Sequence, residues 1–405
     1  MYKHFLLLAA VLCVLLAGKA GAETAIAAER GLPDAPDGSA ADRAASIAAS
    51  LDDGRLAAQV ILSGVDGNRF LSGAMKDLFR AVPPGGIMLF RYNLDAEKAQ
   101  VRNFLAECAG FVADVQRSGV PETGGAKTAP GVPPFMAVDH EGGFVHRFGP
   151  GITRLPAAAY WREYAEKNGA GAALAALEEA AFKSGAEIRD LGITVNLAPV
   201  AEMLNAENRS FLGGRSFGED PLFVEAAAAA FIRGMERAGI ICTVKHFPGN
   251  TGIDPHESAQ TLSGGVETLS EMVKPFSGLV KNYHVPAIMV SHALVPALDP
   301  NRIASLSPLV MGKWLREELG FNGIILSDDF FMGAAAQGGR PEDAAAVSLA
   351  AGADMVMAWP LNLTRVHRAI LAALEDGRLS REKLRESAAR IIAEKIRAGI
   401  LASNE

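Results

Sequence analysis

The chain has 405 residues, of which 49% are hydrophobic, and a formal net charge of -7. This hydrophobic content is ample for a large packed core. The acidic balance lacks the basic footprint of nucleic-acid-binding proteins, so we expect no nucleic-acid partner. The length suits two or three ordinary domains or a single large α/β barrel.

Residues 1–22 have the pattern of a secretory signal peptide. A short basic start and an apolar run over residues 5–17 precede Ala20-Gly21-Ala22, which has the small residues of a cleavage site. The run is short for a membrane span. We therefore expect an exported protein, periplasmic or secreted, with no stable membrane span after the signal is removed. The alternative is a retained N-terminal anchor.

The segment after this signal is expected to be a flexible lead-in over residues 23–45, because it is rich in Ala, Asp, Pro and Gly without sustained periodicity. The folded domain is expected over residues 46–400. Cys108 and Cys242 are the cysteines that follow the signal, and they are too far apart for a metal-binding spacing. We expect neither a metal nor a cofactor.

Short apolar runs then alternate with stretches rich in Ala, Glu, Lys and Arg. The apolar runs are typical of strands buried on both faces, and they cover residues 57–65, 86–90, 135–139, 193–200, 241–246, 287–292, 324–328 and 354–359. The intervening stretches are typical of helices and include residues 96–116, 171–191, 221–238, 269–283 and 365–375. Eight such units predict the α/β class and a closed (β/α)8 TIM-type barrel, whereas five or six would favour an open sheet. Residues 119–134 are expected to form a surface loop.

Polar residues follow four of the predicted strands. They are Asp139-His140-Glu141, Lys245-His246, Ser291-His292 and Asp328-Asp329. Because active sites of such barrels lie at the carboxyl ends of the strands, we expect these side chains to share one site. The alternative for each residue alone is a helix cap or an ion pair with a neighbour.

The segment from Lys245 to His256 is the most informative. Lys245 and His246 are adjacent on a strand, so their side chains point to opposite faces unless the strand end is distorted. Asp254 and His256 lie on the Pro- and Gly-containing loop that follows, where they can form a hydrogen-bonded pair. A carboxylate beside an imidazole raises its basicity, as a general acid/base requires. The residues alone leave open a plain turn in which His256 is solvated.

The residues near two other strand ends suit the chemistry of sugars. Asp328 at the mouth of a strand is placed to attack an anomeric carbon, with a second group as acid/base. The His-Glu pair after Asp139 would indicate a zinc protease only with a second histidine at the position of Phe144. Asp139 accepting hydrogen bonds from sugar hydroxyls, and Arg147 donating to them, is the better interpretation.

The loop over residues 208–221 contains Arg-Ser-Phe twice, so either Arg209 or Arg215 can reach into a pocket. Taken together, the chain resembles glycoside hydrolase family 3, specifically its single-domain bacterial β-N-acetylglucosaminidases, over residues 57–358. The resemblance rests on Val-Asp-His-Glu-Gly-Gly at 138–143, Arg-Ser-Phe-Gly-Glu-Asp-Pro at 215–221, Lys-His-Phe-Pro-Gly at 245–249 and Ser-Asp-Asp at 327–329.

The resemblance implies a role for each of these residues. Asp328 would be the nucleophile, His256 the acid/base and Asp254 its partner. The implied sugar contacts are Asp139, Arg147, Arg215, Lys245 and His246. Family members that cleave glucosides carry the acid/base on a second domain, so the implied activity is retaining exo-hydrolysis of β-linked N-acetylglucosamine in peptidoglycan or chitin fragments.

The loop after Lys245 departs from the family pattern. Relatives usually have His-Gly where this chain has Asn250-Thr251, and the interval to Asp254 is about two residues shorter than in relatives. Three alternatives stay open, and the first of them is suggested by this shorter loop. They are a catalytically weak sugar-binding barrel, an N-acetylglucosamine phosphorylase of the same family, and a metal hydrolase that uses His246, Asp254 and His256.

Overall fold

The computed structural model describes residues 38–118, 131–149, 151–332, 335 and 339–402. The predicted signal peptide, residues 23–37 of the predicted lead-in and residues 119–130 of the predicted surface loop lie outside this described part.

In the described part of the chain, eight parallel strands form one sheet, in the order β10-β7-β5-β4-β3-β2-β1-β11. These strands are β1 (Ile61–Gly64), β2 (Gly86–Leu89), β3 (Phe135–Val138), β4 (Val195–Asn196), β5 (Ile241–Phe247), β7 (Ala287–Val290), β10 (Ile324–Ser327) and β11 (Val356–Ala358). The sheet closes where Met355, directly before β11, accepts a hydrogen bond from the Ser327 N–H at 3.0 Å. The predicted (β/α)8 barrel is confirmed, with each strand inside or overlapping its predicted range.

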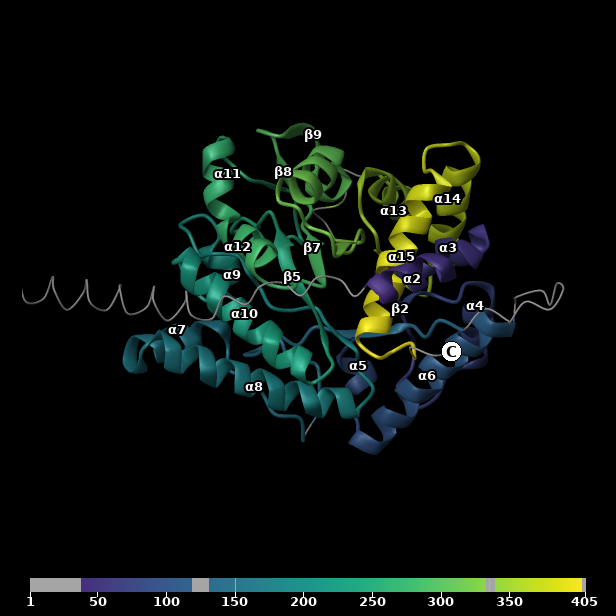
Figure 1. The fold of residues 1–405 in the computed structure, drawn as a ribbon, viewed down its shortest axis with the longest axis horizontal. Coiled ribbons are helices and arrows are strands. Elements are labelled where there is room, and N and C mark those ends of the chain that lie inside the picture. The colour runs from purple at the N-terminus through teal and green to yellow at the C-terminus, as the bar shows by residue number, and fades with distance from the viewer. Residues whose placement is uncertain (1–37, 119–130, 150, 333–334, 336–338, 403–405) are drawn as a thin grey trace, which may run out of the picture.

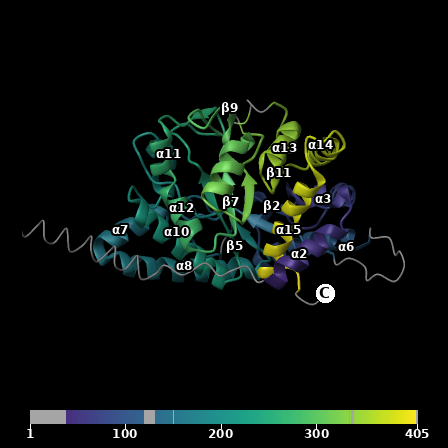
Figure 2. The ribbon, with the colours of Figure 1, turned by 45° about the horizontal axis from the view of Figure 1, so that its top comes forward.

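The strands are buried on both faces, as their apolar sequences require. All four residues of β1, β2, β3, β7 and β10 are buried. Helices lie around the strands (Figures 1 and 2), so one face of each strand is directed to the barrel interior and the other to the helices. Such two-sided burial explains the continuous apolar runs in the sequence, in place of an alternation of polar and apolar residues.

Helices surround the sheet and connect its strands. They are α2 (Gly38–Ser50), α3 (Asp53–Gln59), α4 (Gly73–Ala81), α5 (Arg91–Leu94), α6 (Lys98–Ser118), α7 (Ala158–Asn168), α8 (Ala170–Asp190), α9 (Arg209–Leu212), α10 (Pro221–Arg237), α11 (Val266–Met272), α12 (Lys274–Asn282), α13 (Pro341–Ala351), α14 (Leu363–Glu375) and α15 (Arg381–Arg397). Three short helical segments are η1 (Gly213–Arg215), η2 (Ala304–Leu306) and η3 (Leu309–Glu318).

Helix α10 shows why the predicted helices form where they do. Its N-cap Asp220 accepts a hydrogen bond from the Leu222 N–H at 3.0 Å, and Pro221 occupies the first turn. Gly239, with φ +75°, follows its C-terminal end. These start and stop signals are local, so the predicted and observed limits agree.

The predicted lead-in over residues 23–45 is wrong for residues 38–45, which belong to helix α2. Buried Ala40, Ala44, Ile47 and Ala48 lie on one face of α2, which packs against α15 (Figure 1). The first described helix thus lies against the last one. The sequence signal was weak because most residues on this buried face are alanines, which are only weakly hydrophobic. They become buried only where α2 contacts α15.

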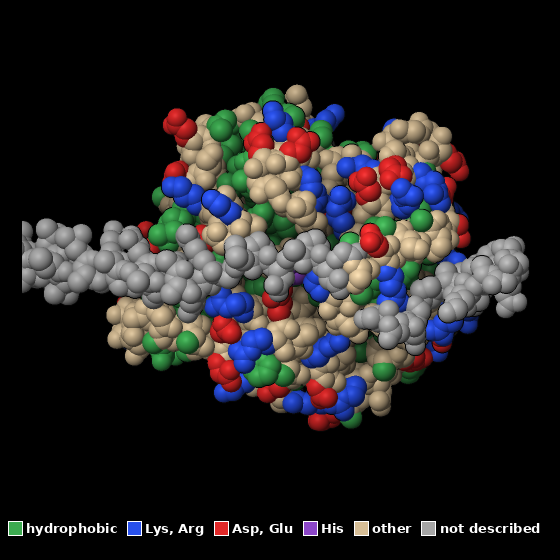
Figure 3. Space-filling view, in the orientation of Figure 1, with side chains coloured by type: hydrophobic (Ala, Val, Ile, Leu, Met, Phe, Trp, Pro, Cys, Tyr) green, Lys and Arg blue, Asp and Glu red, His purple; other side chains and the backbone are tan. Residues whose placement is uncertain are grey.

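The carboxyl ends of the strands carry the longer connections. Two of these connections share a small sheet, in which β6 (Gln260–Thr261) follows β5, and β8 (Ala293–Val295) and β9 (Asp299–Ile303) follow β7. Acidic and basic side chains are intermixed over the face drawn in Figure 3. Among the described residues, every helix is too short or too polar to span a lipid bilayer.

Candidate active site

A cavity of about 330 Å³ opens at the carboxyl ends of the barrel strands. We call it the site cavity. Its polar lining contains all eight residues to which the family resemblance assigned a role, namely Asp139, Arg147, Arg215, Lys245, His246, Asp254, His256 and Asp328, together with Glu141 and Asp329. His140, Ser291 and His292, which were also expected at this end of the barrel, do not line it. The apolar part of its wall includes Phe90, Phe144, Phe211 and Trp359. The barrel therefore brings together residues that are up to 189 positions apart in the chain, from Asp139 to Asp328.

The floor of the site cavity is a buried network of charges. Lys245 Nζ donates to Asp139 Oδ1 and lies near Glu141 Oε1, both at 2.7 Å. Arg215 donates from Nε and Nη2 to the two oxygens of Glu141, each at 2.8 Å. Burial opposes the charge of Glu141, but Lys245 and Arg215 outweigh it and hold the pKa of Glu141 well below its usual range. Burial likewise opposes the charge of Lys245, while Asp139 and Glu141 raise the pKa of Lys245.

Donors in this network remain available to a ligand. Lys245 has three N–H donors, and two carboxylates account for two of them. Arg147 Nη2 lies 3.8 Å from Asp139 Oδ2, and its buried Nε has no hydrogen-bond partner among the described residues. Because the Arg147 side chain is 34% exposed and lines the site cavity, its outer donors, like the third donor of Lys245, can reach a polar ligand there.

Lys245 and His246 both line the site cavity although they are neighbours on β5. The pairing register between β5 and β7 shifts between Val244 and Phe247, and the Lys245–His246 peptide bond is cis. The register shift interrupts the regular alternation of side chains at this strand end. His246 Nδ1 contacts Glu202 Oε1 at 2.6 Å, which fixes the orientation of the imidazole ring.

Asp254 and His256 form the predicted pair at the mouth of the site cavity. His256 Nδ1 lies 2.8 Å from Asp254 Oδ1, and the His256 backbone N–H donates to the same oxygen at 2.9 Å. That backbone hydrogen bond and the imidazole lower the pKa of Asp254. The His256 side chain is 70% exposed, so its other nitrogen, Nε2, is accessible from the cavity mouth.

Asp328 follows β10 directly, and its backbone N–H donates to the Val290 carbonyl of β7 at 3.1 Å. Its Oδ1 accepts a hydrogen bond from the Asp329 N–H at 2.9 Å. Asp329 is tied down separately, because Trp359 Nε1 donates to its Oδ2 at 2.9 Å. Burial and the neighbouring Asp328 raise the pKa of Asp329. The two adjacent carboxyl groups thus have different environments.

The comparisons with known proteins agree with this geometry. The family model "Glycosyl hydrolase family 3 N terminal domain" matches residues 97–393, which is more than half of the chain. The chain belongs to glycoside hydrolase family 3. It is 38% identical over 278 residues to a beta-hexosaminidase of Methylococcus capsulatus, covering 67% of this chain and 80% of that protein. The predicted family and the predicted class of enzyme, a glycoside hydrolase, are confirmed.

Solved structures of family 3 members have the same fold. A β-N-acetylglucosaminidase from Paenibacillus sp. FPU-7 matches with a TM-score of 0.77 and 31% identity, covering 88% of this chain and 65% of that one. The chain therefore spans about two thirds of that relative. NagZ from Neisseria gonorrhoeae, solved in complex with N-trifluoroacetyl-D-glucosamine, matches with a TM-score of 0.66 and 27% identity, covering 83% of this chain and 89% of that one.

The sequence analysis assigned no role to two acidic residues at the site of this family 3 hydrolase. Glu141 was expected to share the site with Asp139, but its pairing with Lys245 and Arg215 was not predicted. His140, which was expected beside it, contacts Ser184 Oγ at 2.8 Å and does not line the site cavity. Glu202 is buried and accepts hydrogen bonds from both His246 and Asn250. The signal for Glu202 was a lone carboxylate shortly after β4 in an otherwise apolar stretch.

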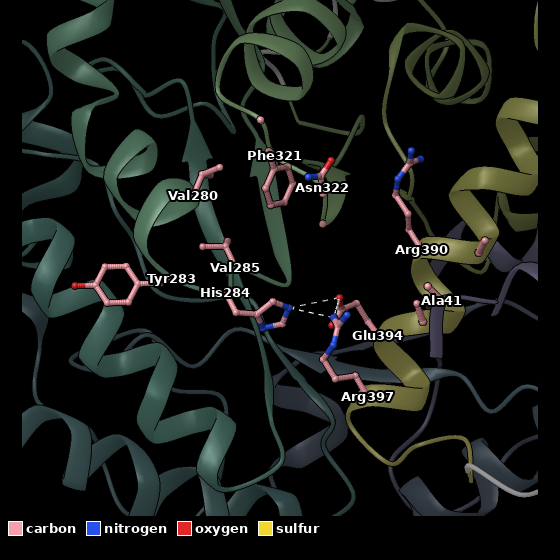
Figure 4. Close-up of a pocket in the computed structure, with 14 residues that line it drawn as sticks. Ala41, Val280, Tyr283, His284, Val285, Phe321, Asn322, Arg390, Glu394 and Arg397 are labelled. Carbon is pink, nitrogen blue, oxygen red and sulfur yellow. Dashed lines mark hydrogen bonds and ion pairs between the residues drawn. The ribbon is translucent and has the colours of Figure 1, made fainter. Parts of the chain in front are cut away.

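The hydrolase has a second cavity, of about 520 Å³, at the opposite end of the barrel (Figure 4). His284 and Phe321, which line it, precede β7 and β10, so it lies at the amino ends of those strands. Its ionic side chains already have partners, since His284 contacts Arg397 of the lining and Glu236 outside it, each at 3.0 Å. Although larger, this cavity contains none of the family's motifs, and we assign the chemistry to the site cavity.

Proposed function

We propose that this hydrolase is a retaining exo-β-N-acetylglucosaminidase that releases terminal β-linked N-acetylglucosamine from peptidoglycan or chitin fragments. The observation that carries the proposal is that the Asp254–His256 pair and the Asp328 carboxylate line the same cavity. A nucleophile and a separate acid/base on one sugar site are what double displacement requires. The names of the relatives from Methylococcus and Paenibacillus support the choice of sugar.

In the first step of the proposed mechanism, an Asp328 oxygen attacks the anomeric carbon as the bond to the glycosidic oxygen breaks. His256, protonated on both nitrogens, donates its Nε2 proton to the departing oxygen. The other proton stays on Nδ1, where it is hydrogen-bonded to Asp254. The products are the aglycone alcohol and a glycosyl ester of Asp328. His256 is left as neutral imidazole.

In the second step, the neutral Nε2 of His256 removes a proton from water as the water oxygen attacks the same anomeric carbon. The ester bond breaks, Asp328 regains its negative charge and the sugar leaves with its original β configuration. His256 regains its proton, so the enzyme returns to its starting state. Asp254 stabilises the imidazolium form and fixes the tautomer throughout.

The buried network supplies the contacts that hold the terminal sugar in this proposal. Asp139 accepts hydrogen bonds from sugar hydroxyls, while the spare donors of Lys245, Arg147 and Arg215 donate to them. His246 completes the set, with its ring oriented by Glu202. Because the network is paired before the sugar arrives, little reorganisation accompanies binding.

The charges favour water over phosphate as the acceptor of the glycosyl group. Each cation that lines the site cavity is already paired with a carboxylate, Arg147 and Lys245 with Asp139, and Arg215 with Glu141. A phosphate dianion would therefore face a site whose positive charge is already neutralised. We expect no acceleration by phosphate and no sugar 1-phosphate among the products.

The proposal is tested with 4-nitrophenyl N-acetyl-β-glucosaminide and the matching β-glucoside. We expect release from the first substrate only, and a loss of about a thousandfold or more in Asp328→Asn. Asp114→Asn, on an exposed face of α6, is the matched control and should keep full activity. NMR of the first-formed sugar should show the β anomer. Tight sugar binding without turnover would instead favour a sugar-binding barrel.

We propose further that the protein is exported, on the strength of the apolar run and small residues in its first 22 positions. Expression of the full chain in a bacterial host, followed by N-terminal sequencing of the recovered protein, tests this. A mature protein that begins at Glu23 and is recovered outside the cytoplasm is expected. An uncleaved protein in the membrane fraction would favour the retained anchor.

A further inference from the structure

Phe144 is an exposed aromatic side chain that the mechanism above does not use. It is 74% exposed and lines the site cavity. Of the large hydrophobic side chains that the described residues expose, it alone belongs to this cavity. It also makes none of the ring–ring contacts found among the described residues. A large apolar surface exposed beside a polar pocket is typical of a ligand contact.

The backbone that carries Phe144 is held in place on both sides. Gly142 and Val145 pair across a tight turn, and the Gly143 N–H donates to the Leu155 carbonyl at 2.9 Å. Gly142 has φ +102°, and a Cβ there would lie 2.3 Å from a neighbouring backbone carbonyl. The turn is hydrogen-bonded and closely packed, and it presents Phe144 from an ordered backbone.

The exposed fractions of the side chains that line the cavity show that Phe144 lies near its mouth, as His256 does, and not at its floor. Lys245 and Glu141, at the floor, are 3% and 6% exposed, whereas Phe144 and His256 are 74% and 70% exposed. The terminal sugar binds the polar floor, and His256 faces the glycosidic oxygen. The aglycone beyond that oxygen therefore extends toward the mouth, where Phe144 lies.

We propose that Phe144 forms the platform of an adjoining subsite, on which a pyranose ring of the aglycone stacks. This inference rests on the proposed N-acetylglucosaminidase function. A pyranose with equatorial substituents presents C–H groups on its two faces, and these carry partial positive charge. The face of an aromatic ring is negative, so the two surfaces attract each other while both leave water. Phe144 thereby selects substrates whose second unit is a sugar over simple alkyl glycosides.

The kinetic test compares Phe144→Ala with the wild-type enzyme on two substrates, N,N′-diacetylchitobiose and methyl N-acetyl-β-glucosaminide. We expect kcat/KM for the disaccharide to fall about tenfold, mainly through KM, and the methyl glycoside to lose far less. Phe144→Trp should restore the disaccharide rate. Phe70→Ala, which removes a side chain that is 65% exposed and does not line the cavity, is the matched control. Equal losses on both substrates, or none on the disaccharide, would overturn the proposal.

A binding measurement separates this inference from the proposed function. Asp328→Asn and the double variant Asp328→Asn with Phe144→Ala are titrated with the disaccharide by calorimetry. A dissociation constant that rises about tenfold on loss of Phe144 supports the platform even if the wild-type enzyme hydrolyses nothing. An unchanged constant overturns the platform even if the enzyme is an active N-acetylglucosaminidase.

Discussion

Glu202 gives the sharpest test of how the site is held, because its buried carboxylate accepts four hydrogen bonds. The donors are the backbone N–H and Nδ1 of His246, at 3.3 and 2.6 Å, and the backbone N–H and Nδ2 of Asn250, at 2.6 and 3.0 Å. Glu202 thus joins the end of β5 to the start of the loop that carries Asp254 and His256.

The change Glu202→Gln replaces one acceptor oxygen with an NH2 group that can only donate. Whichever way the amide is turned, at least one backbone N–H of His246 or Asn250 then faces a donor inside the protein. An unsatisfied buried donor costs about 1–3 kcal/mol, and the hydrogen bonds that remain lose their charge-assisted strength. We therefore expect the free energy of unfolding to fall by about 3 kcal/mol or more.

Urea unfolding followed by circular dichroism measures this loss, with Glu163→Gln on the exposed face of α7 as the matched control. We also expect KM to rise in Glu202→Gln, because His246 and the start of the loop that carries Asp254 and His256 lose hydrogen bonds to the same carboxylate. A variant that unfolds within about 1 kcal/mol of the wild type and keeps its KM would show that Glu202 anchors neither.

Three further predictions concern the Asp254–His256 pair, the buried Lys395 of α15 and the turn at Gly142. His256→Ala should slow substrates with poor leaving groups by about 10²–10⁴-fold and activated aryl glycosides far less, and equal losses would contradict its role as the acid. Burial lowers the pKa of Lys395 to about 7, so its folded pKa is below its unfolded value. Stability should therefore rise by about 1.4 kcal/mol per pH unit between pH 7 and 9, compared with Lys395→Met, whereas the exposed Lys313→Met should match the wild type in urea unfolding. Gly142→Ala should destabilise the enzyme more in thermal unfolding than Gly377→Ala, because both glycines have positive φ but only Gly142 has a carbonyl within 2.3 Å of the added Cβ.

The order of strands and helices was readable from the sequence because its causes are local. Strands buried on both faces need continuous apolar runs, and helices such as α10 carry their own start and stop signals. The barrel rule then placed Asp139, Lys245 and Asp328 at one end of the sheet without any knowledge of contacts. The family motifs then assigned roles to those positions.

The pairing of charges could not be predicted from the sequence. Glu141 neutralises Lys245 and Arg215, and Glu202 orients His246, across separations of 44 to 104 positions. Both glutamates follow predicted strands, but the local pattern does not show which cation or imidazole each one contacts, because that partner comes from a distant strand or loop. Helix α2 was missed for a related reason, since its alanine-rich face is recognisable as a buried face only once it packs against α15. Sequence determines which residues a strand or helix contains, whereas burial and partners arise when distant elements pack together.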